Sequence, residues 1–430
     1  MISATLLVTM VVLMALRVPV SIAIGIATML ALLLAGLPLS VIPRLMVDGL
    51  DSFALLAVPF FVLAGNLMNA GGVTERIFAF ARALFGTIRG GLAQVNVAAS
   101  MIFAGMSGAA LADLAGLGAV EMRAMRRSGY PSDVSAAVTL ASCTVGPIIP
   151  PSIVLVVYGL ATDTSVGRLF LGGIVPGVMI GLILMLSISL WVRLRRTAWG
   201  QPEPFRWRAA WQTFRAGALA LLSPVLIIGA LVTGVTTPTE VGALAAAYAL
   251  LVGLAQRELT WRRLWDCLVE SVLTTAVIMY IIAVSVVMGW LITTERIPHE
   301  AADAITAYVQ SPLLGLLAIN LFLLAVGMFL ETLPALLILA PILLPVVKAF
   351  GIDPVHFGVV ICFNLIIGII TPPMGIGLFV AARVADIRPE RVLRATLPFF
   401  VPLLLGLLII SLFPQLTLWL PDLVFGPRLG

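Results

Sequence analysis

One apolar segment occurs twice in this chain of 430 residues, and the two copies align without a gap at a shift of 222 positions, from Gly105 to Gly327. The shift brings Gly327, Gly351, Gly368, Pro372, Pro373 and Pro398 onto Gly105, Gly129, Gly146, Pro150, Pro151 and Pro176. Glycine and proline decide where a helix is interrupted. Paired interruptions inside apolar segments are typical of the binding site of a membrane transporter.

Long apolar stretches recur from one end of the chain to the other. Hydrophobic residues make up 61% of the chain and charged residues 10%, and the mean hydropathy is +1.16. A membrane helix needs about 20 apolar residues, so these stretches predict an all-α polytopic membrane protein with roughly 11 to 13 embedded segments. We expect residues 1–430 to form a single integral membrane permease. The N-terminal run continues past Arg17, so we expect a retained span rather than a cleaved signal peptide.

The basic residues of the two copies indicate opposite orientations, because cytoplasmic loops concentrate Lys and Arg. After its Gly-rich break the first copy carries Arg123, Arg126 and Arg127, whereas the second copy carries only Lys348. At the far end the bias reverses. The first copy has one arginine there, Arg168, and the second copy has four, at Arg383, Arg388, Arg391 and Arg394. The copies are therefore predicted to be an inverted repeat.

The same bias divides the chain into a first inverted repeat at 53–192, a cytoplasmic connector at 193–215 and a second inverted repeat region at 216–420. The connector combines Arg with Trp, as membrane interfaces do, and a second basic loop at 257–263 lies on the same side. Segment 76–89 is also basic, but only about 27 apolar residues follow it, whereas two crossings need roughly 40. The region that leads from these basic residues to Arg123 is either broken and re-entrant or an interfacial amphipathic arm.

Two proline-rich loops interrupt the apolar helices: GPIIPPSI from Gly146 and ITPPMGIG from Ile370. Proline removes a backbone donor and opens the helix, and the freed carbonyls must face protein or a water-filled cavity. Carbonyls beside a hydroxyl suit Na⁺, and half-helix N-termini suit a carboxylate. The alternative is a pair of proline kinks that neighbouring helices satisfy. The candidate substrate and ion residues of these loops are Thr144, Gly146, Pro150, Pro151, Ser152, Gly368, Thr371, Pro372, Pro373 and Gly375.

Each copy also contains a break followed by an acidic residue, Asp113 after Gly105-Met-Ser-Gly and Glu331 after Gly327-Met-Phe-Leu. Acidic residues within membrane segments usually mark ion or substrate paths. The alternative is a position near a helix end, paired with a loop arginine. Because Asp113 and Glu331 do not align, the repeat supports a shared break and not a shared ligand.

Several function classes are not supported. Three cysteines, Cys143, Cys267 and Cys362, share no metal or redox spacing, and the two histidines, His299 and His356, are expected in short loops. We find no nucleophile–base pair, phosphate loop or dinucleotide fingerprint. The net charge of +5 comes from arginines beside the spans, which is not a nucleic-acid signal. We therefore expect neither an enzyme nor a cofactor, and no metal other than Na⁺.

At these motifs the chain resembles the large membrane subunit of the tripartite ATP-independent periplasmic (TRAP) transporters. The segments that carry the resemblance are Leu55–Gly72, Gly90–Asp113, Thr139–Ile153, Thr236–Leu250, Gly327–Val346, Gly351–Gly358 and Ile370–Val380. The resemblance implies an inverted-repeat ion-transporter-type fold with broken helices and re-entrant hairpins, working as an elevator. It also implies a multi-pass protein of the bacterial inner membrane that uses a Na⁺ gradient for secondary uptake of organic anions. These would be carboxylates, such as C4-dicarboxylates or sugar acids.

The implied partners are a small four-span membrane subunit and a periplasmic substrate-binding protein that delivers the anion. The resemblance places one cation site around Ser107, Gly108 and Asp113 and another around Gly327, Glu331 and Thr332, with the two Pro-Pro loops bordering the substrate. The chain has Ala109 where the family usually has Ser, and Gly377 where it often has Asn. Two alternatives stay open: a stand-alone Na⁺- or H⁺-coupled carboxylate carrier of similar architecture, and a non-transporting membrane scaffold.

The predicted inversion can be tested with single cysteines at positions 126 and 348, which are equivalent in the repeat. We expect them to react with a membrane-impermeant thiol reagent from opposite faces of the membrane, because the two copies would be upside down relative to each other. Labelling of both positions from one face would contradict the inversion.

Overall fold

A computed structural model of the protein describes residues 2–16, 18–195, 199, 202–232, 236–296, 311–372 and 375–427. Helices and no strands occur in these ranges, and seven of the helices are long and apolar enough to cross a membrane. The first half contains α1 (Ile2–Ala15), α2 (Val20–Leu34), α3 (Val41–Leu50), η1 (Phe53–Leu56), α4 (Ala57–Ala70), α5 (Val73–Phe85), α6 (Leu92–Ser107), α7 (Ala110–Ala115), α8 (Leu117–Arg127), α9 (Ser132–Ser142), α10 (Ile153–Ala161) and α11 (Val166–Arg195). The second half contains α12 (Trp207–Val232), α13 (Pro238–Ala255), α14 (Trp261–Thr294), α16 (Pro312–Gly327), α17 (Thr332–Ala349), α18 (Pro354–Ile370), α19 (Ile376–Ala385), α20 (Pro389–Leu412) and α21 (Gln415–Phe425).

The sequence repeat recurs in the helix boundaries. A shift of 222 positions carries the start of α7 and the end of α8 onto the two ends of α17, Thr332 and Ala349. It carries the start of α9 onto the start of α18, and the starts of α10 and α11 to within one residue of those of α19 and α20. Both copies therefore contain a broken helix followed by a helical hairpin with an open tip, as the Gly and Pro positions predict.

The two copies differ where one of them has an additional helix breaker. Gly116 separates α7 from α8, whereas α17 continues through the corresponding Ile338. Helix α9 ends at Ser142, whereas α18 continues to Ile370. The first copy has Pro147, which lacks the amide needed to extend α9, and the second copy has Ile369 in its place. The first hairpin therefore has the longer open tip.

The contacts between the copies are reciprocal. Helix α7 packs against α19 and α17 packs against α10, while α9 contacts α20 and α18 contacts α11. Equivalent helices exchange partners in this way when a two-fold axis relates two units. The Arg126 guanidinium donates to the carbonyl of Ala385 at 3.3 Å, which brings the basic ends of both copies together. These contacts agree with an inverted repeat, and the placement of the copies across a bilayer stays a prediction.

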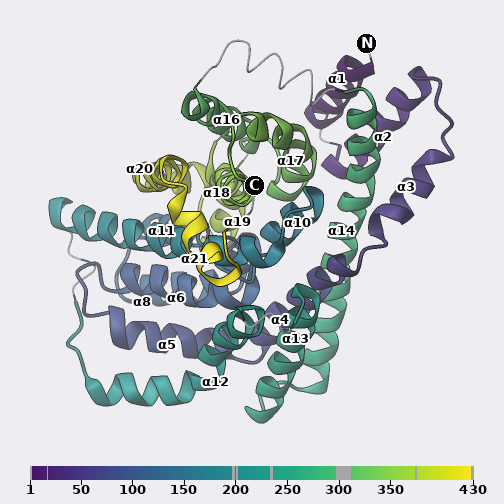
Figure 1. Ribbon diagram of the computed structural model, residues 1–430. Coiled ribbons are helices and arrows are strands. Elements are labelled where there is room, and N and C mark those ends of the chain that lie inside the picture. The colour runs from purple at the N-terminus through teal and green to yellow at the C-terminus, as the bar shows by residue number, and fades with distance from the viewer. Residues whose placement is uncertain are drawn as a thin grey trace.

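A second group of helices, α2, α3, α4, α13 and α14, lies beside the repeat. Helix α14 runs along one side of the molecule, with α2, α3 and α4 against it (Figure 1). Helix α4 packs along α13, and α14 contacts the repeat through α17. The second group therefore meets the repeat along α4 and α14.

Helix α5 shows that the basic segment at 76–89 is an amphipathic arm that packs against α6 and α12. The Arg82 guanidinium forms an ion pair with Glu203 of the connector at 2.7 Å. Arg76 donates to Gln256 and pairs with Glu258 at 3.5 Å, in the turn between α13 and α14. Its basic side chains thus contact loops, while the apolar stretch that follows is broken between α6 and α7 at Gly108.

One other expectation, the loop position of His356, was wrong, and the structure adds detail to two further segments. The N-terminal apolar run forms two helices, α1 and α2, that pack on each other, Arg17 lies outside the described residues, and the retained span stays a prediction. Residues 207–215 of the predicted connector are helical, since no Gly or Pro interrupts them. His356 is buried in α18, where its Nδ1 lies 2.9 Å from the Thr417 hydroxyl, and His299 lies outside the described residues.

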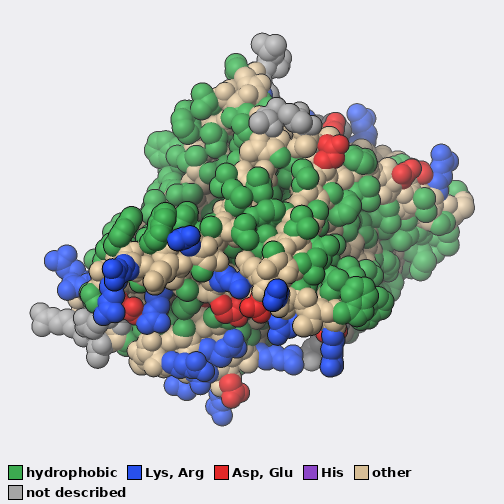
Figure 2. Space-filling view, turned by 90° about the horizontal axis from the view of Figure 1, so that it is seen from below, with side chains coloured by type: hydrophobic (Ala, Val, Ile, Leu, Met, Phe, Trp, Pro, Cys, Tyr) green, Lys and Arg blue, Asp and Glu red, His purple; other side chains and the backbone are tan. Residues whose placement is uncertain are grey.

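Charge and hydrophobicity are separated on the surface. Figure 2 shows many Lys and Arg side chains toward the lower and left edges of one face, further charged side chains at its upper right, and hydrophobic side chains over much of the area between them. Exposed apolar residues such as Leu186 on α11, Val272 on α14 and Val401 on α20 are what a lipid-facing surface requires. The protein is therefore a multi-pass membrane protein with basic margins.

Candidate functional site

A cavity of about 350 Å³, here called the central cavity, lies where the repeat meets the second group of helices. Its lining comes from α4, α14, α18, both helix breaks and the first hairpin. The polar and loop residues that line it are Asn66, Asn69, Gly108, Gly116, Pro147, Glu270, Thr274, Glu331 and Thr332. Breaks that are far apart in the sequence therefore border a single space.

Two helix N-termini open on the central cavity. The first turn of α10 contributes Ile153 and Val154, and the first turn of α17 contributes Thr332 and Leu333. The first amide groups of a helix have no partner within the helix and carry the positive end of its dipole. The cavity can therefore bind an anionic group without a basic side chain.

The first break depends on glycines that allow close backbone approach. Gly108 has φ +65°, and a Cβ there would meet the Pro151 carbonyl and the Ser152 backbone at the tip of the first hairpin. Asp113 follows in α7 and is 3% exposed. A Cβ at Gly146 would lie 2.5 Å from Asp113 Oδ2, so the carboxylate sits against the opening of the hairpin. The structure thus joins Gly108, Asp113, Gly146 and Pro151, which the sequence singled out separately.

The second break has a close backbone contact between two other positions, Gly327 and Gly368. A Cβ at Gly368 would lie 2.5 Å from the Gly327 carbonyl oxygen, so the ends of α16 and α18 touch backbone to backbone. The Thr332 hydroxyl donates to the Leu365 carbonyl at 3.4 Å. Glu331 is the N-cap residue of α17 and lines both the central cavity and a small hollow beside Gly327 and Gly375. Gly327, Glu331, Thr332, Gly368 and Gly375 therefore form one cluster.

The hydroxyls predicted to help hold a cation already donate to backbone carbonyls. Thr144 donates to Ala141 at 2.7 Å, Thr371 donates to Ile367 at 2.7 Å, and Ser152 donates to Pro147. Ser152 also caps α10 by accepting from the Leu155 amide. Their oxygens keep lone pairs, so a role as cation ligands stays a prediction.

The remaining predicted residues lie around these two clusters. Gly105 packs closely on Pro224 of α12, with the Pro150 carbonyl within 4 Å of a Cβ built there. Pro372 directly follows Thr371 at the end of α18. Pro373 and the side chain of Ser107 lie outside what the structure describes.

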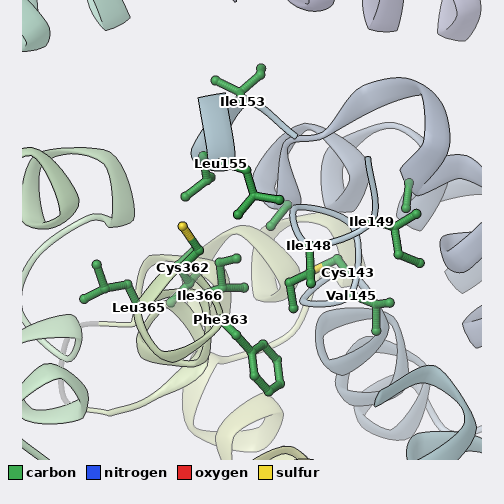
Figure 3. Close-up of a cluster of buried hydrophobic side chains, with 14 of the residues drawn as sticks. Cys143, Val145, Ile148, Ile149, Ile153, Leu155, Cys362, Phe363, Leu365 and Ile366 are labelled. Carbon is green, nitrogen blue, oxygen red and sulfur yellow. The ribbon is translucent and has the colours of Figure 1, made fainter. Parts of the chain in front are cut away.

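Figure 3 shows how the first hairpin is held in place. Ile148 of the open tip and Leu155 of α10 lie beside Cys362 and Ile366 of α18, and all four are fully buried. Burying an aliphatic side chain of this size contributes about 1.5–3 kcal/mol, so this contact fixes the tip to the second copy. The two hairpins are thus joined to each other and not only to their own halves.

Buried asparagines join the helices within each copy. Asn96 of α6 donates to Thr139 of α9 at 2.7 Å and accepts from Ser142 at 2.6 Å. In the second copy Asn364 donates to the side chain of Asn320 at 2.9 Å, and Asn320 donates to Ser411 at 2.8 Å. These residues act as helix-to-helix contacts, as intramembrane amides commonly do.

Sequence patterns alone do not single out the α4 and α14 side of the cavity. Asn66 and Asn69 lie one turn apart on α4, and Asn66 donates to Ser271 at 2.9 Å. Glu270 and Thr274 lie one turn apart on α14. The available signal is the spacing of polar residues by three or four positions on otherwise apolar helices, which becomes meaningful only when both helices face one space.

The charge of the central cavity is unusual for an anion site. Among the described residues that line it, the charged ones are Glu270 and Glu331, and neither Lys nor Arg is present. An anion entering beside Glu331 is repelled by about 4 kcal/mol at 4 Å and an effective dielectric constant near 20. One bound cation next to the acid would offset a repulsion of that size.

Comparison with known proteins gives a consistent result. A family model described as "Tripartite ATP-independent periplasmic transporter, DctM component" matches residues 7–416. The "Sialic acid TRAP transporter large permease protein SiaM" of Vibrio cholerae is 46% identical over 382 residues, 89% of each chain. The "C4-dicarboxylate TRAP transporter large permease protein DctM" of Pseudomonas aeruginosa is 41% identical, over 86% of this chain and 87% of that protein.

Two further comparisons concern length and fold. The "Sialic acid TRAP transporter permease protein SiaT" of Haemophilus influenzae is 41% identical, and the match covers 88% of this chain but 61% of that protein. Among solved structures, the Alcanivorax borkumensis YdaH transporter superposes with a TM-score of 0.63 at 15% identity, over 90% of this chain and 88% of that one. This similarity shows the fold alone.

The close contact between α16 and α18 predicts the effect of one added methyl group. Gly368→Ala should destabilise the protein by about 1–3 kcal/mol, because the methyl group meets the Gly327 backbone, which cannot move away as a side chain can. Thermal unfolding of the purified protein in detergent measures this. Gly229→Ala on α12 is the matched control, since nothing lies within 4 Å of its Cβ. Equal midpoints for the two variants would contradict the contact.

Proposed function

The chain belongs to the family of DctM components, which are the large permease subunits of the tripartite ATP-independent periplasmic transporters, and we propose that a Na⁺ gradient drives its uptake of an organic anion. The observation that carries this proposal is the composition of the central cavity. Two helix N-termini and two acidic side chains border it, and no basic side chain does among the described lining residues.

The helix N-termini of α10 and α17 are the anion-binding elements. Half-helices that end at the middle of a membrane protein bind substrate carboxylates in this way. Asn66, Asn69 and Thr274 add hydrogen-bonding groups on the opposite wall. Cargo with one carboxylate and several hydroxyl or carbonyl groups would use both walls.

The two break clusters supply the cation sites. Asp113 with the Gly108 region forms one, and Glu331 with Gly327 and Thr332 forms the other. Na⁺ prefers oxygen ligands, which carboxylates and the carbonyls of open helix ends provide. Cation binding beside Glu331 lowers the repulsion between this acid and the cargo, so anion and cation bind more favourably together than singly. This is the physical basis of the proposed coupling.

Transport would occur by movement of the repeat against the second group of helices. We assign the moving part to the two hairpins, α9 with α10 and α18 with α19, which belong to the inverted repeats at 53–192 and 216–420 that the connector at 193–215 joins. The central cavity lies on the border between the hairpins and helices α4 and α14. Sliding along this border would carry cargo bound at α10 and α17 across the membrane, as in an elevator.

The partners and the cargo follow from the family. We expect a small four-span membrane subunit and a periplasmic binding protein that delivers the cargo, in the bacterial inner membrane. The chain spans 61% of the SiaT permease and 60% of the "Isethionate TRAP transporter permease protein DctMQ", so these relatives carry additional polypeptide. The relatives are named for sialic acid, 2,3-diketo-L-gulonate, isethionate and C4-dicarboxylates, which are all organic acids. We therefore propose an organic acid anion as cargo.

Coupling is tested by reconstituting the protein with its small subunit and binding protein in liposomes. The binding protein is first screened with sialic acid, 2,3-diketo-L-gulonate, isethionate and succinate, and the acid it retains is used for uptake. Accumulation is expected only under an inward Na⁺ gradient. Uptake driven equally well by a proton gradient would contradict Na⁺ coupling, and uptake without the partners would favour a stand-alone carrier.

The Asp113 site predicts a specific change in Na⁺ dependence. Asp113→Asn should raise the half-saturating Na⁺ concentration for uptake about tenfold or more, because a hydrogen-bonding or charged ligand of this kind contributes about 1.5–3 kcal/mol. Asp48→Asn is the control, since Asp48 is an exposed acid on α3 paired with Arg44. An unchanged Na⁺ titration of Asp113→Asn would remove Asp113 from the site.

A further inference from the structure

A second cavity of about 460 Å³, here called the outer cavity, lies between α3, α10, α14 and α17. Three of these helices, α10, α14 and α17, also line the central cavity. In each of them the residues of the outer cavity come later in the chain. The basic loop at 257–263 precedes α14, so the outer cavity lies on the side away from the predicted cytoplasmic face.

The two cavities are separated by about one helical turn. The residues at the border are Val154 and Val157 on α10, Ile278 and Ile282 on α14, and Leu333 and Leu337 on α17. The steps are three or four residues, which corresponds to a rise of about 5–6 Å. On all three helices the chain therefore passes from the central cavity to the outer cavity in the same direction.

The outer cavity contains a hydroxyl that lacks a partner. Ser285 is 2% exposed, lines this cavity, and its Oγ makes no hydrogen bond to the residues that the structure describes. A buried polar group without a partner costs about 1–3 kcal/mol. Such a group is expected where a polar ligand is bound for part of the working cycle. The described lining contains neither acidic nor basic residues.

We infer that the outer cavity is a second binding site for the transported organic anion, on the outer section of its path, with Ser285 as a hydrogen-bonding contact. The inference rests on the proposed function and adds a site to it. A lipid chain is the other candidate for a largely apolar cavity. It would leave Ser285 without a partner, whereas the hydroxyl, carbonyl and carboxylate groups of the cargo would pair with it.

Gly289 provides a test that does not disturb packing. It lines the outer cavity, and a Cβ there has no neighbour within 4 Å, so a larger side chain starts in open space beside the cavity. Gly289→Leu should lower uptake by the reconstituted complex at least about tenfold. Gly229→Leu on α12 is the matched control, because its Cβ also has no neighbour within 4 Å and it lines neither cavity. Thermal midpoints of both variants report on folding.

Occupancy by cargo is tested with Gly289→Cys, since the three native cysteines are buried. Saturating amounts of the acid retained by the binding protein, with Na⁺, should slow labelling by an externally added methanethiosulfonate reagent at least about threefold. Ser285→Ala should lower uptake about three- to tenfold, the effect of one lost hydrogen bond. Thr275→Val, on α14 outside both cavities, should leave uptake unchanged.

The outcomes separate this inference from the proposed function. Full uptake by Gly289→Leu, or labelling of Gly289→Cys that added lipid slows and cargo does not, would overturn the second site while leaving Na⁺-driven uptake intact. Lack of uptake by the unaltered complex under a Na⁺ gradient would overturn the proposed function and the inference together. Loss of uptake in Gly289→Leu, with cargo protection of Gly289→Cys, supports the outer site.

Discussion

Backbone groups released by a broken helix inside a membrane must be paired within the protein, because hydrocarbon offers no partner. In this chain glycine, which has no side chain, lets one backbone segment approach another closely at each break. Gly108 meets the Pro151 carbonyl at the first break, and Gly327 meets Gly368 at the second. Both contacts draw a hairpin tip toward a broken helix of its own copy. The remaining groups at these breaks are left to face a cavity and not lipid.

That arrangement determines the chemistry of the central cavity. Opening the helices at Ser152 and Glu331 turns the N-termini of α10 and α17 toward one space. The same breaks place Asp113 against Gly146 and Glu331 beside Gly327. Positive helix ends and negative side chains therefore lie close together, an arrangement in which an anion and a cation stabilise each other. The family is one of transporter permeases and not of enzymes, which agrees with a cavity built for binding.

The sequence predicted the parts of this site that depend on local backbone chemistry. The Gly and Pro positions located both breaks and both hairpin tips, and the starts of α7, α9, α10 and α11 coincide to within one residue with those of α17, α18, α19 and α20. It did not predict that α9 ends earlier than α18, although Pro147 explains it. It left the basic segment at 76–89 ambiguous, because its ion-pair partners Glu203 and Glu258 lie more than 100 residues away.

By itself the sequence determined the class of the protein, the repeat and the positions of its broken helices, since apolar length and the conformations of Gly and Pro are local properties. Only the tertiary structure decided which residues share a cavity. Asn66, Glu270 and Thr274 face the two breaks because α4 and α14 pack beside the repeat, and no local pattern encodes that packing. The same holds for the outer cavity. Ser285 and Gly289 line it because α10, α14 and α17 each border the central cavity first and the outer cavity later in the chain.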